Sequence, residues 1–188
     1  MVFFSSQENY ARDLLKKFNM SNCKITTTPT NRNEKLQRED GTEHADGIMY
    51  RSLVGGLNYL THTRPNIAFS VSVVSTCMDN PTKLHLGAAK RILRYVAGTS
   101  NFGIWFNNVS YSTFKLIGFT DSDWAGCFDD RKGTSGHIFS LGSSVVTWSS
   151  KKQETIALSS SEAEYAAPRS ADRQALWLMK ILADFHVQ

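Results

Sequence analysis

The sequence predicts an α+β or α/β protein in which three helices are followed by a small sheet and a flanking helix. Two observations support this class. Apolar residues between positions 45 and 98 recur with the spacing of amphipathic helices. After Gly98 the pattern changes to short runs rich in β-branched and aromatic residues, separated by turn-forming residues. Of the 188 residues, 41% are hydrophobic and 20% are charged, which is typical of a folded globular chain.

The first 18 residues predict the end of a strand and then one helix. Residues 2–5 form a short apolar run, and a helix is expected from about residue 7 to residue 18, with Tyr10, Leu14 and Leu15 on one face. The apolar start is too short for a signal peptide, and no segment approaches the roughly 20 apolar residues that span a bilayer. We therefore expect a cytoplasmic or nuclear location and no membrane partner.

Residues 19–44 are polar and show no periodicity, which predicts a long surface linker with a turn at Thr28 and Pro29. The three cysteines lie far apart and form no C-x-x-C pair, so reduced thiols are expected instead of disulfides or a zinc site. The five histidines also lack the spacing of metal ligands, and each is expected on the surface or in packing contacts.

Residues 45–98 predict three helices with short connections. The first covers residues 46–60 and contains Gly55 and Gly56, which lower helix propensity but allow a neighbouring helix to approach closely. The second is expected to begin at Pro65, because proline suits the first helical position, and to continue to about residue 78.

The third helix is basic. Asn80 is expected to cap it with Pro81 in its first position, and it should end at Gly98 in a left-handed conformation. Its spacing aligns several cations in one stripe, which suits sequence-independent contacts with nucleic-acid phosphates; a solvated helix face is the alternative. The candidate nucleic-acid-binding residues are Lys83, Lys90, Arg91 and Arg94.

Four strands and one helix are expected after residue 98. The final helix should begin near residue 160 and end near residue 185, and Pro168 should interrupt it at a cost of about 3 kcal/mol or more. The run at residues 155–158 is too short to assign. The strands are expected at residues 102–106, 116–120, 137–141 and 145–149, with the last two forming a hairpin.

Asp121 and Asp123 follow the apolar run at residues 116–119. Carboxylates at the end of a strand are held by a rigid sheet, and side chains two residues apart share one face of an extended chain. Asp-Ser-Asp followed by Ala-Gly is also an ordinary turn sequence. Either a shared acidic site or a turn is compatible with the spacing.

Two glutamates lie at the start of the final helix. Ser161 with Glu164, and Ser159 with Glu162, each fit the capping-box pattern S-x-x-E. Both pairs cannot cap the same helix end, so one carboxylate remains available for another role, such as metal binding.

Several strings resemble, in order, the Pol proteins of copia-type retrotransposons. Those that resemble the segment after the polymerase core are YRSLVGGLNYL at 50–60, TRPNIAF at 63–69 and HLGAAKRILRY at 85–95. Those that resemble the ribonuclease H domain are GFTDSDWAG at 118–126, TSG at 134–136, WSSKKQ at 148–153 and SEAEY at 161–165.

The resemblance implies a domain organisation. Residues 1–18 would be the end of a reverse transcriptase, residues 19–44 a linker, and residues 45–98 a thumb-like unit. Residues 102–188 would be a truncated ribonuclease H-like domain with a mixed sheet and a flanking helix.

The resemblance also implies a chemistry. Acidic side chains of ribonuclease H domains hold two Mg²⁺ ions that activate water for hydrolysis of the RNA strand. Asp121 resembles the first metal-bridging aspartate and Glu164 the glutamate on the first helix, so these two are the candidate catalytic residues and metal ligands. Asp123 and Glu162 are secondary candidates.

The sequence departs from the family pattern in two places. The 188 residues contain neither the Tyr-x-Asp-Asp polymerase signature nor the later acidic residues of ribonuclease H, and Asp184 lies too early to replace them. We therefore expect an inactive fragment of a reverse transcriptase/ribonuclease H polyprotein that binds Mg²⁺ weakly. A nuclease completed by a partner, such as the rest of a Pol polyprotein, and a non-catalytic module that binds an RNA–DNA hybrid or a template–primer duplex are the alternatives.

Overall fold

The chain forms two compact units, Met1–Asn108 and Val109–Gln188. For several residues between 160 and 170 only the backbone is described. None of the described helices is both long and apolar enough to cross a membrane. The computed structural model describes residues 2–31, 36–107, 115–122, 129–153 and 159–185.

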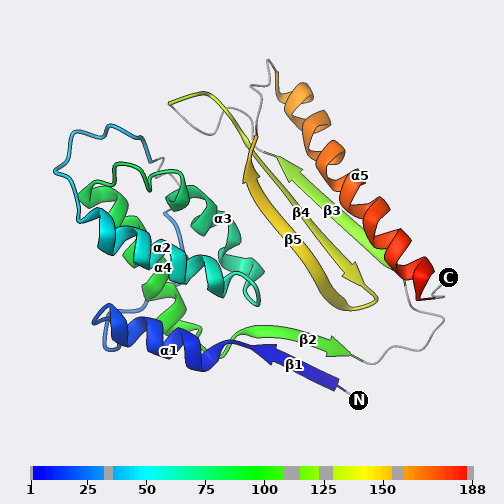
Figure 1. Ribbon diagram of the computed structural model, residues 1–188, viewed down its shortest axis with the longest axis horizontal. Helices are drawn as coiled ribbons and strands as arrows, with labels where there is room; N and C mark the ends of the chain where they lie inside the picture. The colour runs from blue at the N-terminus through cyan, green and yellow to red at the C-terminus, as the bar shows by residue number, and fades with distance from the viewer. Residues whose placement is uncertain (1, 32–35, 108–114, 123–128, 154–158, 186–188) are drawn as a thin grey trace. The chain divides into compact units, whose positions relative to one another are not determined.

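The first unit packs four helices beside a two-stranded sheet (Figure 1). The elements in chain order are β1 (Val2–Ser6), α1 (Glu8–Lys17), α2 (Gly47–Leu60), α3 (Pro65–Ser75), α4 (Lys83–Gly98) and β2 (Gly103–Asn107). The expected strand end, the helix of the first 18 residues and the start of a helix at Pro65 are confirmed.

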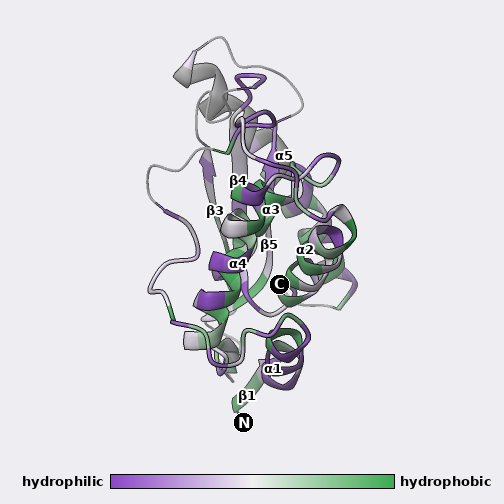
Figure 2. Ribbon diagram, turned by 90° about the vertical axis from the view of Figure 1, so that its left-hand side faces the viewer, coloured by the Kyte–Doolittle hydropathy of each residue, from purple (hydrophilic) through white to green (hydrophobic). Residues whose placement is uncertain are grey.

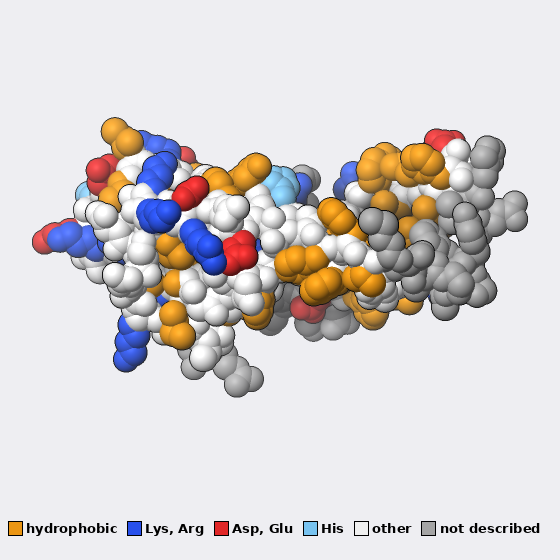
Figure 3. Space-filling model, turned by 90° about the horizontal axis from the view of Figure 1, so that it is seen from below, with side chains coloured by type: hydrophobic (Ala, Val, Ile, Leu, Met, Phe, Trp, Pro, Cys, Tyr) orange, Lys and Arg blue, Asp and Glu red, His pale blue; other side chains and the backbone are white. Residues whose placement is uncertain are grey.

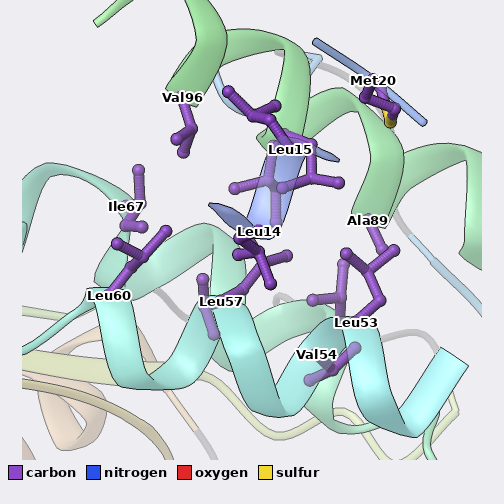
Figure 4. Packing of buried hydrophobic residues seen from close by; sticks show 14 of the residues in the cluster. Leu14, Leu15, Met20, Leu53, Val54, Leu57, Leu60, Ile67, Ala89 and Val96 are labelled. Carbon is purple, nitrogen blue, oxygen red and sulfur yellow. The ribbon is translucent and has the colours of Figure 1, made fainter. Parts of the chain in front are cut away.

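The core of the first unit lies between its helices, as Figure 4 shows. Leu14 of α1 packs against α2 at Gly56, where a Cβ atom would overlap with the leucine side chain, whereas nothing lies within 4 Å of a Cβ at Gly55. The expected close approach therefore holds for the second glycine. The buried side chains include Leu14, Leu15, Leu53, Leu57, Leu60, Ile67, Ile92, Leu93 and Val96.

The predicted start of α4 was wrong by two residues. Thr82 is the N-cap: its hydroxyl accepts a hydrogen bond from the amide of His85, whose ring nitrogen accepts one from the amide of Thr82. This reciprocal pair of hydrogen bonds satisfies two backbone donors. The N-cap is therefore Thr82 and not Asn80. Gly98 ends the helix as expected but is not left-handed; its missing side chain instead makes room for Ile25, 3.3 Å from the Cβ position.

The two strands of the first unit come from its opposite ends. β1 and β2 pair antiparallel, with Phe4 opposite Trp105 and their rings 4.4 Å apart. The strand expected at residues 102–106 therefore lies in the first unit and not with the residues that follow it.

The second unit is an antiparallel three-stranded sheet with one helix (Figure 1). Its strand order is β3 (Leu116–Ser122), β4 (Thr134–Leu141), β5 (Ser144–Lys152), and α5 (Ser160–Asp184) packs against β3 and β4. The predicted hairpin is confirmed, with Gly142 at φ 61° in its turn. The described strands pair only antiparallel, which corrects the mixed sheet that the resemblance implied; the short run at 155–158 lies outside the described residues.

The predicted interruption at Pro168 was also wrong. α5 runs as one helix of 25 residues through the proline. Pro168 is exposed, and Ala171 one turn later is buried. Tertiary packing of one helix face can offset the backbone hydrogen bond that a proline removes.

Candidate nucleic-acid and metal site

Asp121 is the sixth residue of the seven-residue strand β3, and its side chain is exposed. It lies opposite Gly136 of β4, which in turn lies opposite Ser150 of β5. The turn alternative is therefore wrong for Asp121 and Ser122, whereas Asp123 lies outside the described residues. Side-chain alternation places Asp121 on the same face as Phe119, whose side chain is 62% exposed.

The other acidic candidates lie at the start of α5. The backbone of Glu162 and Glu164 belongs to this helix, which packs against β3, and their side chains lie outside the described part of the chain. The described residues contain no group of three His, Cys, Asp or Glu side chains that could hold a metal ion. Among the candidate metal ligands only Asp121 has a described side chain, and it supplies one carboxylate, whereas Mg²⁺ requires several oxygen ligands in octahedral geometry. The described side chains do not by themselves fit a magnesium site.

The basic helix α4 contains four Lys or Arg residues and no acidic residue, and hydrophilic and hydrophobic stretches alternate along it in Figure 2. Two of its cations bind the segment that we expected to be a surface linker. Arg94 Nε donates to the carbonyl of Lys24 at 2.8 Å, and an amino group of Arg91 donates to the hydroxyl of Thr28 at 2.9 Å. The Nε atom of Arg91 is buried and has no hydrogen-bond partner in the part of the chain that the structure describes.

The other two cations of α4 are more accessible. Lys83 is exposed, pairs with the Glu43 carboxylate and donates from its amide to the Glu43 carbonyl at 2.8 Å. Lys90 is partly exposed and forms no ion pair with any described residue. The described residues of this surface linker, 19–31 and 36–44, therefore contact α4 and occupy part of its basic stripe.

A partly buried polar cluster fixes the end of this segment. The Asp40 carboxylate accepts hydrogen bonds from the amide and hydroxyl of Thr42 and from the hydroxyl of Thr82 at 2.6–2.8 Å. These hydrogen bonds, those from Thr42 first, lower the pKa of Asp40 to about 2. His85 is fully buried: because its Nδ1 accepts from Thr82, its Nε2 carries the proton and donates to the Gln37 carbonyl at 2.8 Å.

Sequence patterns did not identify this cluster or the role of Arg64. Thr82 and His85 form a T-x-x-H pair, which differs from the S-x-x-E pattern that marks a capping box. Arg64 is only 2% exposed, and its guanidinium donates to Asn66 and twice to Thr99. Arg64 belongs to no periodic pattern in the sequence. Only the folded chain reveals that its hydrogen bonds connect the start of α3 to the end of α4.

Comparisons with known proteins identify the family. No family model and no solved structure matches the chain. Over 183 residues (97% of the chain) it is 42% identical to the retrovirus-related Pol polyprotein from transposon RE1 of Arabidopsis thaliana, of which it covers 12%. Over 186 residues (95% of the chain) it is 39% identical to the Pol polyprotein from transposon TNT 1-94 of Nicotiana tabacum, of which it covers 14%.

A shorter relative is matched over most of its length. An uncharacterized mitochondrial protein of Arabidopsis thaliana is 38% identical over 175 residues, which are 93% of the chain and 71% of that protein. The chain thus spans a small part of the Pol polyproteins and most of this shorter protein. The extent of the similarity agrees with the strings that resemble Pol proteins, and the chain belongs to the family of retrovirus-related Pol polyproteins of copia-type retrotransposons.

Proposed function

We propose that the chain is a fragment of a retrotransposon polyprotein that synthesises DNA from RNA and hydrolyses the RNA strand of RNA–DNA hybrids, and that the fragment alone is inactive. The observation that carries the proposal is the 42% identity to a Pol polyprotein over 97% of the chain. The 188 residues cover 12% of that relative, so the parent activities are those of a longer protein.

Asp121 and Glu164 are the proposed catalytic carboxylates of the ribonuclease H-like part. The exposed position of Asp121 near the end of β3 supports the assignment of this aspartate. Asp123 and Glu162 are the proposed alternates. When bound, Mg²⁺ would activate water and stabilise the leaving oxygen, and in the complete domain these carboxylates would hold it with further acidic ligands.

A hydrolysis assay tests this assignment. We expect the 188-residue chain, incubated with Mg²⁺ and a labelled RNA–DNA hybrid, to cleave no more RNA than its Asp121→Asn variant. Mg²⁺-dependent cleavage that Asp121→Asn abolishes would contradict the proposed inactivity and would still support the catalytic assignment. Cleavage that both proteins perform equally would contradict the role of Asp121.

A second candidate function is a non-catalytic module that binds the backbone of a hybrid or a template–primer duplex. The observation that favours it is a 16-residue helix, α4, with four cations and no acid. Arg91 and Arg94 hold the docked segment, so Lys83 and Lys90 are the proposed phosphate contacts.

Fluorescence anisotropy with a labelled hybrid at two salt concentrations tests this function. Replacing Lys83 and Lys90 by glutamine should weaken binding and reduce the slope of log K against log salt by about 0.9 for each lost contact. Lys16→Gln with Lys17→Gln on α1 is the matched control. On the face drawn in Figure 3, basic and acidic side chains are interspersed, and on α1 Lys16 pairs with Asp13. Equal losses in both double variants would contradict a specific role for α4.

A further inference from the structure

A polar groove of the second unit lies between the β4–β5 hairpin and α5. Its volume is about 440 Å³, within the range of about 300–1,000 Å³ that small-molecule sites occupy. On the hairpin, His137 lies opposite Ser149. Thr147 and Lys151 lie on the same face of β5 as Ser149, because side chains two positions apart in a strand point to the same side. The side chains that line the groove include His137, Thr147, Ser149 and Lys151 from the hairpin and Arg173 and Gln174 from α5.

The groove is positively charged. Lys151 and Arg173 line it, and no Asp or Glu is among the lining residues that the structure describes. Within the described ranges neither cation forms an ion pair, whereas the adjacent Lys152, on the opposite face of β5, binds Asp130 at 2.9 Å. A carboxylate thus neutralises Lys152 on one face of β5, whereas no described carboxylate neutralises Lys151 on the face toward the groove.

His137 adds a neutral ring to this set. Burial, and next the charge of Lys151, lower the pKa of His137, so the imidazole is uncharged at neutral pH. Its ring centroid lies 5.6 Å from that of Phe139, which is itself 4% exposed, so the imidazole is held against a buried side chain. An anion bound beside Lys151 would offset the repulsion that disfavours protonation of this ring.

These groups discriminate between classes of ligand. Two cations without a carboxylate exclude metal ions and basic peptides, because like charges repel. An apolar ligand would leave the hydroxyls of Thr147 and Ser149 without partners. A guanidinium, an ammonium, two hydroxyls and an amide together match the several acceptor oxygens of a phosphate group.

We propose that this groove binds a phosphate group through Lys151 and Arg173, with Thr147, Ser149 and Gln174 as neutral partners. The site shares no residue with Asp121 or with α4, so it goes beyond the proposed function. The phosphate could belong to a free phosphate compound or to a nucleic-acid backbone, and the two sources share the same chemistry at the groove.

The test follows the His137 ring signals by NMR in the full chain while inorganic pyrophosphate or a short RNA–DNA hybrid is added. We expect a saturable shift of these signals and a rise of the His137 pKa on binding. Arg173→Gln and Lys151→Gln should each weaken binding by about tenfold or more, as loss of a hydrogen bond to a charged group does. Lys180→Gln, which removes the same charge from α5 outside the groove, should change the affinity little.

Each outcome either identifies the source of the phosphate group or overturns the proposal. A shift with pyrophosphate that both groove variants weaken supports the site with a free phosphate compound as ligand. A shift with the hybrid alone, weakened by the same variants but retained when Lys83 and Lys90 are replaced, supports a backbone phosphate and is independent of α4. No shift with either probe, or equal affinity in Arg173→Gln and Lys180→Gln, overturns the proposal.

Discussion

At the scale of single residues, Arg64 shows how a charged side chain can be part of the core. Its guanidinium donates to the carbonyl and hydroxyl of Thr99 at 2.9 and 2.6 Å and to Asn66 at 3.2 Å, and it lies 5.4 Å from the centre of the Phe102 ring. Burial lowers the pKa of this arginine, and the group remains charged at neutral pH. No carboxylate among the described residues neutralises it, so the hydrogen bonds and the contact with the Phe102 ring offset its desolvation.

We expect Arg64→Met to lower the free energy of unfolding of the first unit by about 2–3 kcal/mol, because it removes three hydrogen bonds from a charged donor, including the one to the carbonyl of Thr99. Urea titration followed by circular dichroism measures this change. Arg12→Met is the control: Arg12 is exposed and pairs with Glu8 on α1, and its loss should cost less than about 1 kcal/mol. Equal midpoints for the two variants would show that the Arg64 hydrogen bonds contribute nothing.

Asp40 should make the stability of the first unit depend on pH. Its pKa is about 2 in the folded chain and 3.8 when unperturbed. Because folding lowers this pKa, the ionised carboxylate stabilises the fold above about pH 4, and this contribution is lost as the pH falls from about 4 to about 2. Asp40→Asn should flatten the curve of unfolding free energy against pH in this window.

The control for this pH dependence is Asp13→Asn on α1, since Asp13 is exposed and contacts Lys16 at 3.5 Å. We expect its curve to follow that of the unmodified chain between pH 2 and pH 4. Hydrogen exchange of residues 36–45 should also speed up in Asp40→Asn alone. A curve for Asp40→Asn that keeps the full slope would rule out the hydrogen bonds from Thr42 and Thr82 as its cause.

At the scale of elements, adjacent glycines of α2 have opposite roles. Gly56 faces Leu14 of α1, which is 4% exposed, whereas Gly55 has open space around its Cα. An exposed glycine in a helix lowers stability because it loses more backbone freedom on folding than other residues do. At a helix contact the same residue is needed, because a larger side chain would separate the two helices.

Gly55→Ala should therefore raise the free energy of unfolding by about 0.5–1 kcal/mol, and Gly56→Ala should lower it by about 1–3 kcal/mol. The two variants differ by one position and introduce the same methyl group, so each is the control for the other. Thermal melts followed by circular dichroism measure both changes. A stabilising Gly56→Ala would mean that Leu14 moves aside without cost.

At the scale of the whole molecule, the two units differ in how much apolar surface they bury. The core cluster of the first unit includes Leu53 and Leu57 at 0% exposure. In the second unit Phe139 is buried, whereas Phe119 and Trp177 are 62% and 55% exposed. Because buried apolar area is the main favourable term in folding, the second unit should be the less stable of the two.

We expect two unfolding transitions in urea, with the amides of β3–β5 losing protection from hydrogen exchange before those of α2–α4. Leu57→Ala creates a cavity in the first unit and should lower the midpoint of its transition, at a cost of about 2–5 kcal/mol. The midpoint of the second unit should stay unchanged. One transition for all amides, shifted as a whole by Leu57→Ala, would contradict the independence of the two units.

The sequence by itself determined where most elements lie and which family the chain belongs to. Helices and strands have periodic apolar patterns, Pro65 begins a helix because of its own ring, and the hairpin at β4–β5 joins neighbours in the chain. The local apolar run also predicted the strand before Asp121, although β3 continues two residues beyond the expected end and includes this aspartate. Such features depend on residues a few positions apart, so they can be recognised in a single sequence.

Only the tertiary structure decided which of the basic residues remain accessible. Three features join segments far apart in the chain: the contacts of Lys24 and Thr28 with α4, the pairing of β1 with β2, and the groove that both Lys151 and Arg173 line. Contacts of this kind have no periodic signal, because either partner looks like an ordinary polar or apolar surface residue when viewed alone. The free energy that selects them comes from packing and hydrogen bonds formed when distant segments meet.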